Sequence, residues 1–246
     1  MKEVRYYKSY DQDFVESKNQ NYKLKDNYKW IHNSIIYTIF SYIVYYVIFL
    51  VAVIYNKFIL RVKIRNKKLL KGYKKYYLYS NHTMELGDVL NPPIVTFPKR
   101  PYIICSPANL GVPVLGKILP LAGAIPIPDS ISKMKEFRTA ISKKNIVVVY
   151  PEAHVWPYCT FIRDFGNSAF HYPVEDNMPV FTSTTVYKKG RRNKPKIEII
   201  IDGPFMIDTN LSRKENIKKL HDEVYNSLVK NSLENEVEVI TYKKED

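Results

Sequence analysis

Cysteine, glycine and clustered histidine are scarce in this sequence. Its 246 residues include two cysteines, Cys105 and Cys159, which do not form a CxxC pair. This excludes a disulfide framework and argues against a structural zinc site. The five histidines are scattered, none with HExxH spacing, and the eight glycines never approach a GxGxxG pattern. We therefore expect no bound metal and no cofactor.

Acidic residues are also few. The chain has 24 of them against 38 Lys and Arg residues, for a formal net charge of +14. Such an excess predicts an anionic partner, which could be nucleic acid, an anionic membrane surface or a phosphorylated substrate. The basic residues gather beside an apolar segment and do not alternate with aromatic residues, so we expect no nucleic-acid partner.

Charge is missing altogether from Ser34 to Tyr55, a run of 22 residues. As a helix this run would be roughly 33 Å long, about the thickness of a bilayer's hydrocarbon core. The next stretch, 56–75, holds nine basic and no acidic residues. The pattern predicts a membrane-inserted helix over 34–60, with the main domain on the cytoplasmic side.

The aromatic residues of this region leave two modes of insertion open. Trp30, Tyr37 and Tyr55 lie near the ends of the run, where they would suit an interfacial aromatic belt. Tyrosines in the middle of the run are equally compatible with a shallow insertion that does not span the bilayer.

The remaining chain divides into a polar segment, 1–33, and an α/β domain, 61–246. The polar segment shows no clear periodicity, so it is either loosely ordered or an interfacial helix. In the domain, strands alternate with helices, which predicts one partly parallel sheet flanked by helices. The predicted strands are 76–80, 103–105, 123–127, 145–150, 180–186 and 196–201, with a turn at 202–204 and a last edge strand or tail at 234–241. The predicted helices are 110–119, 130–143 and 211–233.

Histidine and carboxylate side chains follow two of these strands. Asn81-His82-Thr83-Met84-Glu85-Leu86-Gly87-Asp88 follows the first strand, and Pro151-Glu152-Ala153-His154 follows the all-apolar strand 145–150. Ligands of parallel sheets bind beyond the carboxyl ends of the strands. A histidine beside a carboxylate is the minimum equipment for general-base catalysis, although each segment could also be a capped helix start.

Together these segments resemble the glycerolipid acyltransferases, the superfamily that includes 1-acyl-glycerol-3-phosphate acyltransferase. The family's Asn-His-(x)4-Asp motif matches Asn81-His82, and its Pro-Glu-Gly-Thr-Arg motif matches Pro151-Glu152. Its glycine-rich strand segment matches the stretch that begins at Gly123. The resemblance covers residues 60–230 and implies a membrane-bound enzyme.

The match departs from the family pattern in two places. The family's Asp would fall on Gly87, and the acid here is Asp88. On a regular helix Asp88 would face away from His82 and Glu85 would share its side, so both acids are candidates for the partner of His82. The two arginines that hold the acceptor phosphate in the family are absent. The basic residues that could replace them are Lys133, Lys135, Arg138 and Arg163.

The resemblance implies acyl transfer from a thioester, acyl-CoA or acyl-carrier protein, to a hydroxyl of a lysophospholipid such as lysophosphatidic acid. His82 would be the general base, with Asp88 or Glu85 as its partner. The implied substrate-binding residues are Asn81, Gly123, Glu152, His154 and Arg163. The departures leave open an alternative, a membrane-anchored lipid-binding protein of the same fold without activity.

Overall fold

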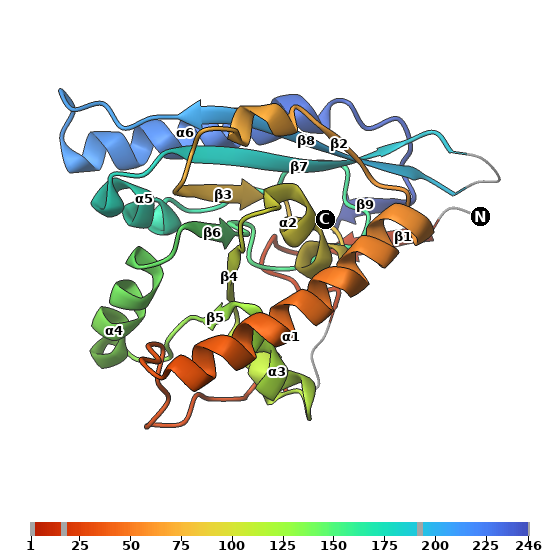
Figure 1. The fold of residues 1–246 in the computed structure, drawn as a ribbon. Helices are drawn as coiled ribbons and strands as arrows, with labels where there is room; N and C mark the ends of the chain where they lie inside the picture. Colours follow the sequence, from red (N-terminus) through yellow and green to blue (C-terminus); the bar gives the residue numbers. More distant parts are fainter. Residues whose placement is uncertain (1–2, 16–18, 191–193, 246) are drawn as a thin grey trace.

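A seven-stranded sheet lies at the centre of the structure, a computed structural model that describes residues 3–15, 19–190 and 194–245 (Figure 1). Its strand order is β2-β8-β7-β3-β6-β4-β5. All neighbours are parallel except β7 and β8, which are antiparallel. The strands are β2 (Lys63–Arg65), β3 (Tyr76–Ser80), β4 (Tyr102–Cys105), β5 (Ala124–Pro126), β6 (Ile146–Val149), β7 (Val180–Lys188) and β8 (Lys196–Phe205).

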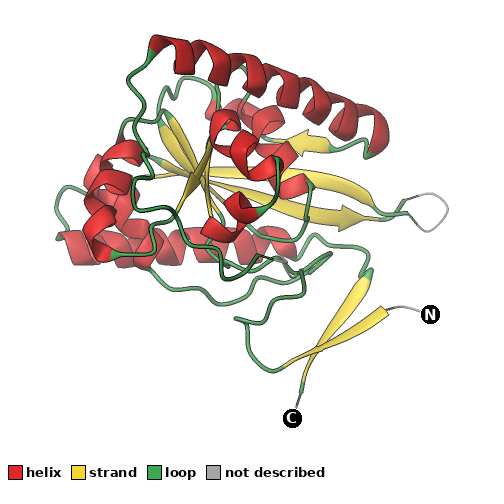
Figure 2. Ribbon diagram, turned by 90° about the horizontal axis from the view of Figure 1, so that it is seen from below, coloured by secondary structure: helices red, strands yellow, loops and turns green. Residues whose placement is uncertain are grey.

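Helices cover both faces of this sheet (Figure 2). The α-helices are α1 (Ile35–Val53), α2 (Gly87–Thr96), α3 (Leu115–Ala122), α4 (Ile131–Ser142), α5 (His171–Asp176) and α6 (Arg213–Ser232). Shorter helical turns are η1 (Ile54–Ile59), η2 (Lys67–Leu70), η3 (Pro107–Gly111) and η4 (Ser168–Phe170). The predicted class, one α/β domain with a partly parallel sheet flanked by helices, is confirmed.

The central strands are buried on both faces, as their apolar sequences predicted. Tyr77 and Tyr79 of β3 pack with α6, while Tyr76 and Leu78 on the opposite face pack with Val95 of α2. Alternate residues of one strand thus contribute to two separate cores. This fixes the register of β3 and, with it, the place where the chain leaves the sheet at Asn81.

Three sequence predictions are corrected within this domain. Residues 202–204 do not form a turn, because β8 continues to Phe205 with an irregularity in its pairing with β7. The predicted helix 110–119 begins at Leu115, after the turn η3. The edge strand or tail predicted at 234–241 is a strand only from Ile240 and continues to Lys244, as β9. The helix α2, for which no element was predicted, contains Pro92 and Pro93.

The N-terminal segment is neither loose nor helical where it is described; residues 1–2 and 16–18 lie outside the described residues. β1 (Glu3–Tyr7) pairs in parallel with β9 (Ile240–Lys244), so the two ends of the chain form a small separate sheet. Farther along, Trp30 is buried and donates from Nε1 to the Pro126 carbonyl at 2.8 Å. Trp30 therefore packs into the domain and does not belong to the interfacial belt that the sequence suggested.

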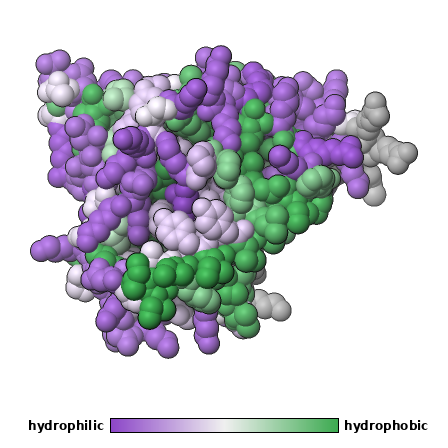
Figure 3. Space-filling model, in the orientation of Figure 1, coloured by the Kyte–Doolittle hydropathy of each residue, from purple (hydrophilic) through white to green (hydrophobic). Residues whose placement is uncertain are grey.

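The apolar run forms a helix that lies against the domain and does not project from it (Figure 1). α1 and η1 together make a helix from Ile35 to Ile59 that is long and apolar enough to cross a membrane. One side packs on α2 and α3 and buries Ser41, Tyr45 and Ala52. The other side exposes apolar residues along its whole length, a green band in Figure 3: Ile35, Ile36, Ile39, Phe40, Ile43, Val47, Leu50, Val51, Ile54, Phe58 and Ile59.

Candidate active site

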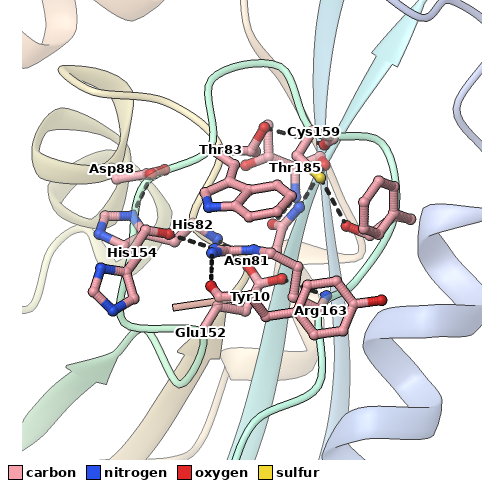
Figure 4. Close-up of polar contacts among 12 residues, drawn as sticks. Tyr10, Asn81, His82, Thr83, Asp88, Glu152, His154, Cys159, Arg163 and Thr185 are labelled. Carbon is pink, nitrogen blue, oxygen red and sulfur yellow. Dashed lines mark hydrogen bonds and ion pairs between the residues drawn. The ribbon is translucent and has the colours of Figure 1, made fainter. Parts of the chain in front are cut away.

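His82 and Asp88 form a hydrogen-bonded pair where the chain leaves the carboxyl end of β3 (Figure 4). His82 Nδ1 lies 2.7 Å from Asp88 Oδ2. The His82 side chain is 18% exposed and that of Asp88 only 4%. Within the described chain, no hydrogen bond engages the second ring nitrogen, Nε2. The pair thus has the geometry in which a buried acid orients an imidazole whose other nitrogen can take a proton.

The local backbone explains why Asp88, six residues from His82, can reach it. Residues 81–84 form no regular helix or strand and α2 begins only at Gly87, so the helical spacing that would turn Asp88 away does not apply. A Cβ at Gly87 would lie 2.6 Å from the Met84 Cε, so only glycine allows this close approach. Glu85, the other candidate partner, has an exposed position in the intervening turn.

The surroundings of Asp88 act on its charge in opposite directions. Burial raises the pKa of the Asp88 carboxyl above its ordinary value. Hydrogen bonds from His82 and from the Met84 backbone N–H, at 2.9 Å, act to lower that pKa. Asp88 also lies in the first turn of α2, where the helix dipole favours a negative charge.

Tyr150 is a site residue that the sequence reasoning missed. Its ring stacks on the His82 imidazole with the centroids 4.4 Å apart, and its hydroxyl donates to the Asp88 carbonyl at 2.6 Å. Tyr150 follows β6, the strand beside β3, so it reaches the same edge of the sheet. The sequence feature that could have identified Tyr150 as a site residue is its position directly before Pro151-Glu152.

Glu152 holds two segments of backbone in place. One carboxylate oxygen accepts the His82 backbone N–H at 2.7 Å, and the other accepts the Arg163 backbone N–H at 2.8 Å. The Arg163 guanidinium lies 3.5 Å from the same carboxylate, and both side chains are almost fully buried. Both carboxylate oxygens are therefore engaged by the protein. This arrangement fits a role in ordering the site better than direct contact with a substrate.

Arg163 is buried beneath the site and does not open onto it, as Figure 4 shows. Its side chain is 1% exposed and donates to the carbonyls of His154 and Tyr10. The guanidinium also lies 4.7 Å from the Trp156 ring centroid. The expectation that Arg163 binds an acceptor phosphate is thus corrected, because its buried guanidinium contacts backbone carbonyls and Glu152.

The other basic residues considered for that role do not gather at the site either. Arg138 is paired with Glu175 and Asp176 at 2.7 Å each. Lys133 of α4 lies 3.7 Å from Asp129, which directly precedes the N-cap of that helix. Lys135 also lies on this helix, α4, at an exposed position, and α4 leads into the amino end of β6.

Of the remaining predicted residues, Asn81 and His154 lie at the site and Gly123 does not. Asn81 links β3 to β7, with its side chain bonded to the backbone N–H and carbonyl of Thr185 at 2.8 and 3.0 Å. His154 is half-buried near the pair, and its Nδ1 lies 2.6 Å from Asp13 Oδ1. Gly123 ends α3 with a φ of 115° at the amino end of β5, the opposite edge of the sheet from His82. The structure therefore does not bring Gly123 to the site.

Backbone hydrogen bonds tie the two predicted segments together. The Trp156 N–H donates to the His82 carbonyl at 3.1 Å, and the Tyr158 N–H donates to the Thr83 carbonyl at 2.9 Å. In the described residues, no group of three or more His, Cys, Asp or Glu side chains is arranged to hold a metal ion. The site therefore consists of the partly exposed imidazole of His82 and the buried carboxyl of Asp88. The two loops that follow β3 and β6 are joined by hydrogen bonds around this pair.

Comparison with solved structures gives matches for this chain. The chain is similar to the crystal structure of the 1-acyl-sn-glycerophosphate (LPA) acyltransferase PlsC from Thermotoga maritima. The TM-score is 0.48 and the identity 14%, over 80% of this chain and 95% of that chain. No protein-family model matches the sequence. No curated protein matches it.

Proposed function

We propose that this protein is a membrane-associated O-acyltransferase that moves a fatty acyl group from a thioester to a hydroxyl of a lysophospholipid. The observation that carries the proposal is the 2.7 Å contact between His82 Nδ1 and Asp88 Oδ2, on an imidazole side chain that is 18% exposed. Support also comes from the order of the two motifs along the chain and from the hydrogen bond that joins them, Glu152 to the His82 N–H.

In the proposed reaction, His82 Nε2 takes the proton from the acceptor hydroxyl as its oxygen attacks the thioester carbonyl. Asp88 holds the proton on Nδ1 and stabilises the imidazolium. When the tetrahedral intermediate collapses, the C–S bond breaks and the imidazolium returns its proton to the leaving thiolate. The products are an ester and a free thiol, and no covalent enzyme intermediate is needed. Such base catalysis is typically worth about 10²–10⁴ in rate.

The acceptor would reach the site from a lipid surface. The exposed apolar side of α1 has the composition of a surface that contacts acyl chains. It leads through η1 to the basic stretch 56–75, which would attract anionic lipid at about 1 kcal/mol per residue near the surface. The Asn56 side chain donates to the carbonyl of Leu90 in α2 at 3.2 Å, so the end of this helix is joined to the element that carries Asp88. We further propose that the catalytic domain is cytoplasmic.

A product assay tests the proposal. Detergent-solubilised full-length protein is incubated with labelled acyl-CoA or acyl-carrier protein and with lysophosphatidic acid, other lysophospholipids or monoacylglycerol. We expect a new diacyl product with one donor and a preferred acceptor, which His82→Ala abolishes. If no acceptor gives product while labelled lipid binds equally to both proteins, the acyltransferase proposal is wrong and a lipid-binding role replaces it.

A further inference from the structure

Two basic residues occupy the opposite edge of the sheet from His82. Arg100 and Lys144 come shortly before β4 and β6, neighbouring parallel strands that begin at Tyr102 and Ile146. The amino ends of parallel strands meet at one edge, so the two side chains are brought together there. Both lie against the ring of Tyr102, with Arg100 Cζ 4.9 Å and Lys144 Nζ 4.4 Å from its centroid.

Arg100 is buried with most of its hydrogen-bonding capacity unused. Its residue exposure is 9%. Nη2 donates to the Ser41 hydroxyl at 2.9 Å and to the Leu121 carbonyl at 2.7 Å. The buried Nε has no hydrogen-bond partner. A guanidinium has five N–H donors, and two of them are engaged here.

Neither cation has a counter-charge in the described part of the chain. No ion pair with a described carboxylate forms at Arg100 or Lys144, in contrast to Arg138 and Arg163. Burial, together with the charge of Arg100, holds the pKa of Lys144 below its ordinary value. Buried charges are normally paired or bound to a ligand, because an uncompensated one is costly.

A cavity of about 100 Å³ opens beside these two side chains. One water needs only roughly 10–15 Å³, so a small polyatomic anion has room. Its described lining contains four basic residues and no acidic one; the basic residues are Lys29, His32, Arg100 and Lys144. Glu136 accepts the backbone N–H of the lining residue Trp30 at 3.3 Å, but Glu136 itself is not part of the lining.

Tyrosine hydroxyls add neutral donors to this charge. Tyr37 and Tyr102 line the cavity, and in the described chain their hydroxyls make no hydrogen bond. A phosphate group has several acceptor oxygens and suits a set that combines a guanidinium fork, an ammonium and hydroxyls. The charge and the hydrogen-bond donors of the cavity lining therefore suit a phosphate group.

We propose that this cavity is a second, non-catalytic site that binds a phosphate group, either of a membrane-lipid headgroup or of a free phosphate ion. Its wall includes Thr38 and Ser41 of α1, and the two residues between them, Ile39 and Phe40, belong to the exposed apolar side of the same helix. The cavity lies where β4 and β6 begin, whereas His82 follows the carboxyl end of β3, so the two sites occupy opposite edges of the sheet. The proposal is independent of acyl transfer, because nothing in it uses the His82–Asp88 pair.

The test compares two adjacent lysines. Inorganic phosphate is titrated into the full-length protein in detergent at constant ionic strength. The change in tryptophan fluorescence reports binding, because Trp30, one of two tryptophans, lines the cavity. We expect saturable binding that weakens at least about tenfold in Lys144→Ala, which removes a charge-assisted donor. Lys143→Ala removes an equal charge from the exposed neighbouring position and should leave the affinity unchanged.

A second arm identifies the source of the phosphate. Vesicles of phosphatidylcholine with and without phosphatidic acid are mixed with the same variants, and the bound fraction is measured by flotation. Binding gained with phosphatidic acid and lost in Lys144→Ala assigns the site to a lipid headgroup. Binding of inorganic phosphate without this vesicle effect assigns it to a soluble ion. If Lys144→Ala and Lys143→Ala behave alike in both arms, the proposed site is wrong.

Arg100 provides a variant that keeps the buried charge. Arg100→Lys retains a cation and removes the fork, so it should also weaken phosphate binding. Its circular dichroism spectrum and melting temperature are recorded beside the titration. If Arg100→Lys does not fold, the pair of lysine variants still decides the question.

Discussion

The two edges of the central sheet hold their charges in opposite ways. At the carboxyl edge the buried charged side chains have protein partners, since His82 lies 2.7 Å from Asp88 and Glu152 lies 3.5 Å from Arg163. At the amino edge, Arg100 and Lys144 lie against one tyrosine ring with no described carboxylate beside them. A paired charge holds its side chain in position before any ligand binds. An unpaired buried charge is stabilised most when a ligand of opposite charge binds to it. The carboxyl edge is thus suited to chemistry and the amino edge to binding.

The pairing at the carboxyl edge can be broken at Glu152. Glu152→Gln leaves the buried Arg163 without its counter-charge, and the loss of one partner of a buried pair costs about 3–5 kcal/mol. Urea denaturation should show a fall of this size in the free energy of unfolding. The matched control is Glu175→Gln at the more exposed Arg138 pair, which should cost no more than about 1 kcal/mol. Equal effects of the two variants would contradict the distinction.

The catalytic use of that pairing is tested at Asp88. Asp88→Asn keeps the shape and removes the charge that stabilises the imidazolium, so we expect kcat to fall about 10²-fold, within the range of base catalysis. Glu85→Gln, at the exposed position, tests the other acid considered from the sequence. A large loss in Glu85→Gln with little change in Asp88→Asn would reverse the assignment.

The pH dependence of stability provides a smaller effect at the same residue. Because burial raises the pKa of Asp88, the folded state binds this proton more tightly than the unfolded state does. The contribution to stability is therefore present at low pH and is lost as pH rises from the ordinary value of 3.8 through the raised value. Between these values the free energy of unfolding of the wild type should fall relative to that of Asp88→Asn. Parallel curves in denaturant titrations at a series of pH values would contradict this.

A substitution can supply the carboxylate that Arg100 lacks at the amino edge of the sheet. Lys144→Glu replaces one of two neighbouring cations by a carboxylate beside Arg100. We expect the phosphate response to disappear and the free energy of unfolding to rise by about 1 kcal/mol, the order of one favourable ion pair. Lys143→Glu, at the exposed position, should change neither quantity appreciably. A destabilised Lys144→Glu that still binds phosphate would show that the two cations do not act on a common ligand.

The sequence predicted the two edges unequally, for a physical reason. The carboxyl edge carried its chemistry in two short segments, each directly after a recognisable apolar strand. Periodicity could not predict the partner of His82, because the contact with Asp88 depends on the irregular backbone before α2 and on the missing side chain of Gly87. Arg100 and Lys144 are 44 positions apart in unremarkable sequence, and only the strand pairing of β4 and β6 brings them together.

The N-terminal segment could not have been predicted from its own residues. Its order comes from partners far along the chain, such as the Gln12 carbonyl with Trp156 Nε1 at 2.8 Å and Trp30 with Pro126. A short polar stretch with no periodicity contains no local signal for such contacts. In the same way, the composition of α1 indicated a helix, but only the packing of Ser41 and Tyr45 showed that one side of it belongs to the domain.

The central claim is that His82 carries out acyl transfer, and the most direct test is a single-turnover assay of two histidine variants. His82→Ala and His171→Ala are compared with the wild type using a labelled acyl thioester and lysophosphatidic acid. His171 lies at the start of α5, outside the site. We predict that His82→Ala slows product formation by about 10³-fold, within the range of general-base catalysis, while its bound lipid is unchanged. A rate for His82→Ala equal to that for His171→Ala would contradict the account.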